Sequence, residues 1–129
     1  MSRRLDAAIA KGLGYEVIIE QRMYSMSPFL YHIKMNNGRF RDLPEYFMDG
    51  NAMIELDWEM VALGWRLIVW VDDYGFHALY YESTYKSVDE IISYVMYSGT
   101  EYVAKATTMS LAVALAAYYS LTGKEWKEE

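Results

Sequence analysis

The stretch Trp65-Arg66-Leu67-Ile68-Val69-Trp70-Val71 decides the fold of this sequence. It is short and rich in β-branched and aromatic residues, which is typical of a strand. The residues Asp72-Asp73-Tyr74-Gly75 then favour a turn, and Phe76–Ser83 reads as a returning strand. The sequence therefore predicts a β-hairpin at its centre.

A hairpin tip at Asp73-Tyr74 fixes which side chains share a face, because successive side chains of a strand point to opposite faces. The expected cross-strand pairs are Trp70 with His77, Ile68 with Leu79, and Arg66 with Tyr81. The opposite face carries an apolar set that fits a core: Trp65, Leu67, Val69, Val71, Phe76, Ala78 and Tyr80.

The first face combines a cation, aromatic rings and a titratable ring, contributed by Arg66, Trp70, His77 and Tyr81. This combination suits stacking on a planar ligand together with a charge-assisted contact to an anion. We predict a ligand-binding role for these four residues. Alternatively, Arg66 stacks on Tyr81 or pairs with an acid at the sheet rim. A three-residue loop would shift the register and separate the set.

Upstream of the hairpin, the periodicity predicts a helix over residues 3–11, ended by Gly12-Leu13-Gly14. Two strands follow, Tyr15–Arg22 and Phe29–Met35, and Asn36-Asn37-Gly38 is a strong turn signal. Arg39–Asp42 then reads as a short edge extension. Its Arg39 and Arg41 alternate with Phe40, so we expect both to point the same way, either gripping a phosphate or forming a solvated edge.

Further helices flank the hairpin. Asp49 or Asn51 caps a predicted helix that reaches about Leu63. Its expected buried stripe is Ala52, Met53, Leu56, Met60 and Leu63. Downstream, Val88–Tyr97 reads as a helix or as a strand, and Glu101–Ala106 as a last strand. A final helix over Met109–Leu121 is apolar on nearly all sides, so we expect it to be buried on nearly all sides.

This order of elements predicts one α+β domain that spans residues 1–129. The two hairpins indicate a mainly antiparallel sheet of about five strands. We expect helices on both of its faces, as an α/β/α sandwich.

Composition narrows the functional classes. The 129 residues include no Cys, which excludes disulfides and thiolate metal sites. The net charge of −6 disfavours binding to duplex nucleic acid. The longest apolar stretch is too short to span a bilayer, so we expect no membrane contact. The 13 Tyr and 4 Trp supply more aromatic surface than one small core needs. They indicate either contact with a partner or ligand, or Tyr side chains that fill the rim of the core. Together with the Ala-rich last helix, they also predict self-association into a homo-oligomer.

No motif points to catalysis, a metal or a cofactor. His32 and His77 lie on different predicted strands, and no Gly-x-Ser-x-Gly or His-Glu-x-x-His pattern is present. Glu55, Asp57 and Glu59 lie on the middle helix at spacings of two, so neighbouring acids do not share a face of that helix. We therefore expect them to be solvated rather than to form a site. We therefore expect a protein that is not an enzyme.

Three segments carry a resemblance to a known family. They are Leu5–Tyr15, Leu43–Met53 with its helix ending at Gly64-Trp65, and Ala106–Ala117. Together they resemble the phage ABA sandwich domain, a group of small phage and prophage proteins. The chain departs from that family at Tyr46-Phe47-Met48-Asp49, where Tyr-Ser-Thr-Asp is usual, and at Ser110, where Pro is usual. The stretch Thr84–Gly99 resembles an insertion.

The resemblance implies a phage origin, the sandwich fold and a place in the host cytoplasm, and it carries over no catalytic residue. We therefore expect a phage accessory protein that binds a small, anionic, nucleotide-type host defence signal at a crevice between subunits. The alternative is a protein–protein interaction module that inhibits a host factor or serves as a phage accessory subunit.

Overall fold

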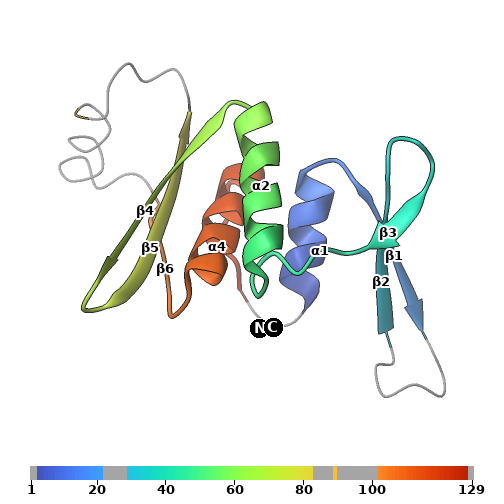
Figure 1. Cartoon of the computed structure of the whole chain (residues 1–129), viewed down its shortest axis with the longest axis horizontal. Helices are drawn as coiled ribbons and strands as arrows, with labels where there is room; N and C mark the ends of the chain where they lie inside the picture. The colour runs from blue at the N-terminus through green and yellow to red at the C-terminus, as the bar shows by residue number, and fades with distance from the viewer. Residues whose placement is uncertain (1–2, 22–28, 83–88, 90–101, 128–129) are drawn as a thin grey trace.

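The structure is a computed structural model that describes residues 3–21, 29–82, 89 and 102–127. Its helices and strands form three layers, with a helical layer between two small antiparallel sheets (Figure 1). The first sheet has the strand order β1-β2-β3, from Glu16–Gln21, Phe29–Lys34 and Phe40–Asp42. The second has the order β4-β5-β6, from Trp65–Asp72, Gly75–Glu82 and Ala104–Ala106.

The helical layer consists of α1 (Arg3–Gly12), α2 (Gly50–Ala62) and α4 (Met109–Thr122). In Figure 1, α2 lies nearest the viewer. The α+β class is therefore confirmed, but the predicted single sheet of about five strands is wrong. So is the expected order of layers, because the helices lie inside the two sheets rather than outside one sheet.

The composition of α4 accounts for this order of layers. Its buried residues point in several directions around the helix: Ala112, Val113, Ala114, Ala116 and Ala117. A helix without a polar face must be covered on most sides. Here α1 and α2 cover part of it and β5 and β6 cover another part, which confirms the burial that its sequence predicts.

The predicted helix ends are confirmed. Asp49 is the N-cap of α2 and accepts a hydrogen bond from the backbone N–H of Asn51 at 2.9 Å. Thr108 caps α4 by accepting from the backbone N–H of Leu111 at 3.2 Å. Gly123 ends α4 in the left-handed conformation. Both helices therefore begin and end where local sequence signals place them.

The predicted register of the central hairpin is also confirmed. The observed pairs include Trp70 with His77, Ile68 with Leu79, and Arg66 with Tyr81. Gly75 has a φ of +125°, and a Cβ there would lie 2.8 Å from the carbonyl oxygen of Ala106. Only glycine allows β6 to approach the tip of the hairpin this closely. The stretch Val88–Tyr97, predicted as helix or strand, falls outside the described residues except for Asp89.

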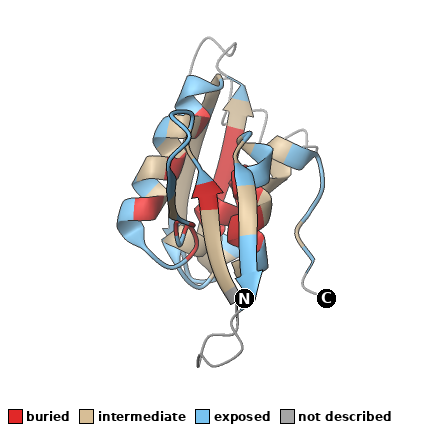
Figure 2. Ribbon diagram, turned by 90° about the vertical axis from the view of Figure 1, so that its right-hand side faces the viewer, coloured by how far each residue is buried: buried red, intermediate tan, exposed pale blue. Residues whose placement is uncertain are grey.

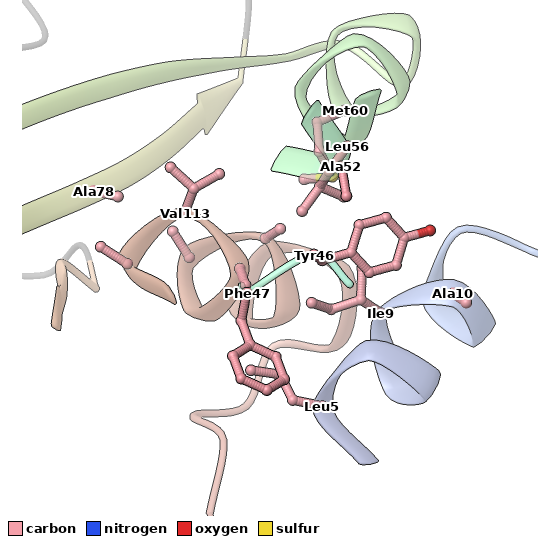
Figure 3. Close-up of a cluster of buried hydrophobic side chains, with 14 of the residues drawn as sticks. Leu5, Ile9, Ala10, Tyr46, Phe47, Ala52, Leu56, Met60, Ala78 and Val113 are labelled. Atoms are coloured by element: carbon pink, nitrogen blue, oxygen red, sulfur yellow. The ribbon is translucent and has the colours of Figure 1, made fainter. Parts of the chain in front are cut away.

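The core lies where the three helices meet the inner faces of the sheets, as the buried segments of Figure 2 show. Leu5, Ile9, Tyr46, Leu56 and Val113 converge there from α1, α2, α4 and the segment before α2 (Figure 3).

The buried stripe predicted for α2 is confirmed at Ala52, Leu56 and Met60. Met53 is only half-buried, and Leu63 is exposed, contrary to the prediction. Leu63 lies at the end of α2, where the chain leaves the helical layer for β4 and no longer faces the core.

One buried charge ties α1 to the segment that leads into α2. Asp6 has no exposed surface, and its Oδ2 lies 2.5 Å from Nη1 of Arg3. The same guanidinium donates to the backbone oxygens of Leu43 and Pro44, and the N–H of Phe47 donates to Asp6 at 3.4 Å. Burial raises the pKa of Asp6 to about 6, and the opposing effect of Arg3 is smaller.

This pKa predicts a stability that depends on pH. Because the pKa of Asp6 is raised on folding from 3.8 to about 6, the folded state binds the proton more tightly and loses stability as the pH rises through that interval. Between pH 7 and pH 4, the free energy of unfolding of the wild type should rise by about 2 kcal/mol relative to Asp6→Asn, which cannot titrate at this position. Urea unfolding of both proteins at several pH values measures this difference. A difference that stays constant with pH would contradict the prediction.

Candidate functional site

The tip of the hairpin gathers aromatic and charged side chains on the outer face of the second sheet. The rings of Trp70 and His77 are stacked, with centroids 5.2 Å apart and planes 9° from parallel. Nε2 of His77 lies 2.9 Å from Oδ1 of Asp72. This contact holds the imidazole in place and, as the largest cause, lowers the pKa of Asp72.

The third strand of this sheet adds a cation. Lys105 of β6 is the cross-strand partner of His77. Its Nζ lies 5.2 Å from the centre of the Tyr74 ring, which is exposed at the hairpin turn. We call the set of Trp70, Asp72, Tyr74, His77 and Lys105 the hairpin face. It presents rings of three kinds beside one ammonium group.

The other two predicted residues of this face lie at the far end of the hairpin. Arg66 and Tyr81 are four positions along their strands from Trp70 and His77, or about 13 Å. The Arg66 guanidinium turns to the backbone oxygens of Val61 and Trp65, at 3.3 and 2.8 Å. The pairs thus share a face, as predicted, without forming one cluster.

Arg39 and Arg41 are placed differently from each other. Arg41 lies in β3 and forms a two-pronged ion pair with Glu55 of α2, with N–O distances of 2.7 and 3.3 Å. This ion pair raises the pKa of Arg41. Arg39 precedes β3 and is exposed. Arg41 therefore joins the first sheet to α2, while a phosphate-binding role for the two residues stays a prediction.

The acids of α2 contact both sheets, contrary to the predicted solvated face. Asp57 accepts a hydrogen bond at 3.0 Å from the hydroxyl of Tyr80 in the second sheet. Glu55 and Glu59 face the first sheet, where Tyr15 donates its hydroxyl to Glu59. These two glutamates are four residues apart and therefore share a helix face. The prediction that the acids of this helix share no face is wrong for this pair.

Two pockets formed by described residues lie near α2 and α4, and neither is lined by residues of the hairpin face. One, of about 230 Å³, is lined by Leu13, Gly14, Tyr15, Asn36, Glu59, Ala62 and Leu63. The other, of about 410 Å³, is lined by Phe47, Met48, Thr107, Thr108, Ser110 and Leu111.

Glu59 supplies a carboxyl group to the lining of the smaller pocket, beside the hydroxyl of Tyr15. Its pKa is raised mainly by burial, while the hydrogen bond from Tyr15 opposes that rise. The same hydrogen bond is the main cause that raises the pKa of Tyr15 to about 12. A perturbed carboxyl in a pocket is one mark of a functional site, but this one is held by a neighbouring hydroxyl. A structural tie between α2 and the start of β1 accounts for both shifts.

The two histidines do not converge. His32 lies on the outer face of the first sheet, 3.6 Å from a carboxylate oxygen of Asp42 and 3.9 Å from one of Glu20. His77 lies on the second sheet. Among the described residues, no group of three or more His, Cys, Asp or Glu side chains is arranged to hold a metal ion.

An exposed apolar stripe on α2 was not among the features predicted from the sequence. Ile54, Trp58 and Val61 lie on its open side, and 72% of Trp58 is exposed. Their spacing of four and three is a helical signal that the sequence already contained. Lys105 was not predicted as a neighbour of His77 either, because the pairing of β6 with β5 joins segments far apart in the chain.

In the described ranges, no helix is long and apolar enough to cross a membrane. No protein-family model, curated protein or solved structure matches this chain. The resemblance to the phage ABA sandwich domain therefore stays a prediction.

The Glu59–Tyr15 contact predicts the effect of removing the hydroxyl. In Tyr15→Phe the carboxylate loses a hydrogen bond that stabilises its charged form, so the pKa of Glu59 should rise above its wild-type value. Carboxyl-selective NMR titration measures it. Tyr80→Phe is the matched control, because it removes the hydroxyl bound to Asp57 and should leave Glu59 unchanged. An unchanged or lower pKa in Tyr15→Phe would refute this assignment.

Proposed function

We propose that this chain acts by binding rather than by catalysis, and that the hairpin face takes a planar, anionic ligand of the nucleotide type. The observation that carries the proposal is the stacked pair of Trp70 and His77 with Lys105 on the adjacent strand. The proposal assigns no role in this binding to the distant Arg66.

Aromatic rings on an outward sheet face provide a surface for a nucleobase. Trp70 and His77 are both half-buried, so they are fixed by their neighbours yet still reach solvent. The contact of His77 with Asp72 fixes its orientation further. Stacking of a base on such rings contributes roughly 1–3 kcal/mol and depends little on base identity.

A phosphate needs a cation within reach of the stacked base. Lys105 is exposed on the same face and lies over the Tyr74 ring, a contact that an incoming phosphate oxygen can replace. Asp72 and Asp73 at the tip oppose an anion, although the contact with His77 occupies one oxygen of Asp72. The local balance therefore favours a ligand with few phosphates over a long nucleic acid. In the phage setting that the resemblance implies, a nucleotide-type host defence signal is such a ligand.

Calorimetric titration with a panel of mononucleotides and cyclic dinucleotides tests this proposal. We expect saturable binding by at least one nucleotide, weakened roughly tenfold by Trp70→Ala through loss of stacking. Lys105→Ala should weaken binding more at low salt than at high salt.

Matched controls lie on the opposite sheet. Phe40→Ala removes an exposed ring from β3, and Lys34→Ala removes an exposed ammonium from β2, so both should bind like the wild type. The proposal fails if no nucleotide binds at concentrations up to about 1 mM, or if the controls weaken binding as much as the hairpin variants.

The second candidate function is a protein–protein interaction module, which the apolar stripe of α2 favours. A host protein bound at that stripe would form a complex that Trp58→Glu abolishes and Trp70→Ala leaves intact. Light scattering of the purified pair distinguishes the two binding surfaces.

A further inference from the structure

An uncharged stripe runs along the open side of α2. Asn51, Ile54, Trp58 and Val61 form it, and all four are exposed. In Figure 1 this helix lies in front of α1 and α4, so its outward side is clear of the other two helices. Ile54 is 49% exposed and Trp58 72%, which is unusual for large apolar side chains that follow one another on one helix face.

The stripe stays uncharged because the acids of α2 are engaged elsewhere. Glu55 and Glu59 contact the first sheet, and Asp57 contacts the second. The chain carries a net charge of −6, so two copies approaching through most other surfaces would repel each other. Two copies that meet through this stripe would bring no like charges together at the centre of the contact.

The spacing of the stripe is symmetric about its own midpoint. Its positions are separated by three, four and three residues, which reads the same in both directions. In an antiparallel pair of α2 helices related by a two-fold axis, Ile54 of each copy would face Trp58 of the other. Asn51 of each copy would face Val61 of the other. Alternating separations of three and four are those of a helix–helix seam.

The two ends of the stripe carry opposite charges. Asp49 is the N-cap of α2, and the Arg66 guanidinium rests on the carbonyl of Val61 at the C-terminal end. An antiparallel copy would bring the Asp49 end of one helix to the Arg66 end of the other, twice. The helix dipoles would also be antiparallel, which is their favourable arrangement.

From this self-complementarity we infer that a second copy of the chain covers the stripe, and that the protein is a dimer joined by antiparallel α2 helices. Trp58 would anchor the centre, as tryptophan often does in interfaces. The inference is independent of the ligand proposed for the hairpin face.

Sedimentation velocity of the full chain over a range of concentrations tests the inference. The wild type should associate into a dimer at micromolar concentrations, while Ile54→Lys and Trp58→Glu should each remain monomeric. Phe40→Glu, which places a charge on an exposed aromatic position in β3, should dimerise like the wild type. Circular dichroism of each variant shows that it is folded.

Mixing the two monomeric variants tests the antiparallel register directly. One copy with Lys at position 54 and one with Glu at position 58 would form one Lys–Glu contact and keep one native Ile–Trp contact. We therefore expect an equimolar mixture of Ile54→Lys and Trp58→Glu to recover a heterodimer, which high salt weakens.

Three outcomes would overturn the inference. A wild type that is monomeric at every concentration up to about 1 mM would show that a second copy of the chain does not cover the stripe. A dimer that persists in both single variants would place the interface elsewhere on the chain. A mixture that stays monomeric would exclude the antiparallel pairing of Ile54 with Trp58.

Discussion

The burial of α4 is the constraint on which the rest of the structure depends. This helix has apolar side chains around most of its circumference, and five of its residues between Ala112 and Ala117 are buried. One sheet could cover only one side of it. With α1 and α2 beside it and the second sheet against it, the helix becomes the centre of the protein rather than an outer layer. Both sheets consequently turn one face away from the core.

The central position of the helices gives α2 four sides with different surroundings. One side supplies Leu56 and Met60 to the core, and the flanks send carboxylates to the two sheets. The remaining side is open and apolar. Because α2 contacts the core and both sheets, its apolar and polar residues are not separated into two clear faces. The exposed stripe is therefore hard to tell from the buried one in the sequence.

On the second sheet, the pairing and rise of the strands determine which side chains lie close enough to act together. Cross-strand pairing brings Trp70 against His77 and Arg66 against Tyr81, but the rise along the strands keeps the two rows apart. Leu79 lies between the rows and is buried. The charge beside the aromatic rings comes instead from Lys105, across the sheet. Lateral neighbours, rather than residues along one strand, therefore determine which groups can act together.

The sequence by itself determined the local elements: the caps at Asp49 and Thr108, the turn at Asn36-Asn37-Gly38, and the register of the central hairpin. These features depend on contacts between residues close in the chain, so local rules suffice. Only the tertiary structure decided that the strands form two sheets, that Arg41 pairs with Glu55, and that Lys105 lies beside His77. Each of these joins distant segments. The apolar sequence of α4 predicts that the helix is buried, but it does not specify which helices and strands cover it, and that choice is made only in the tertiary structure.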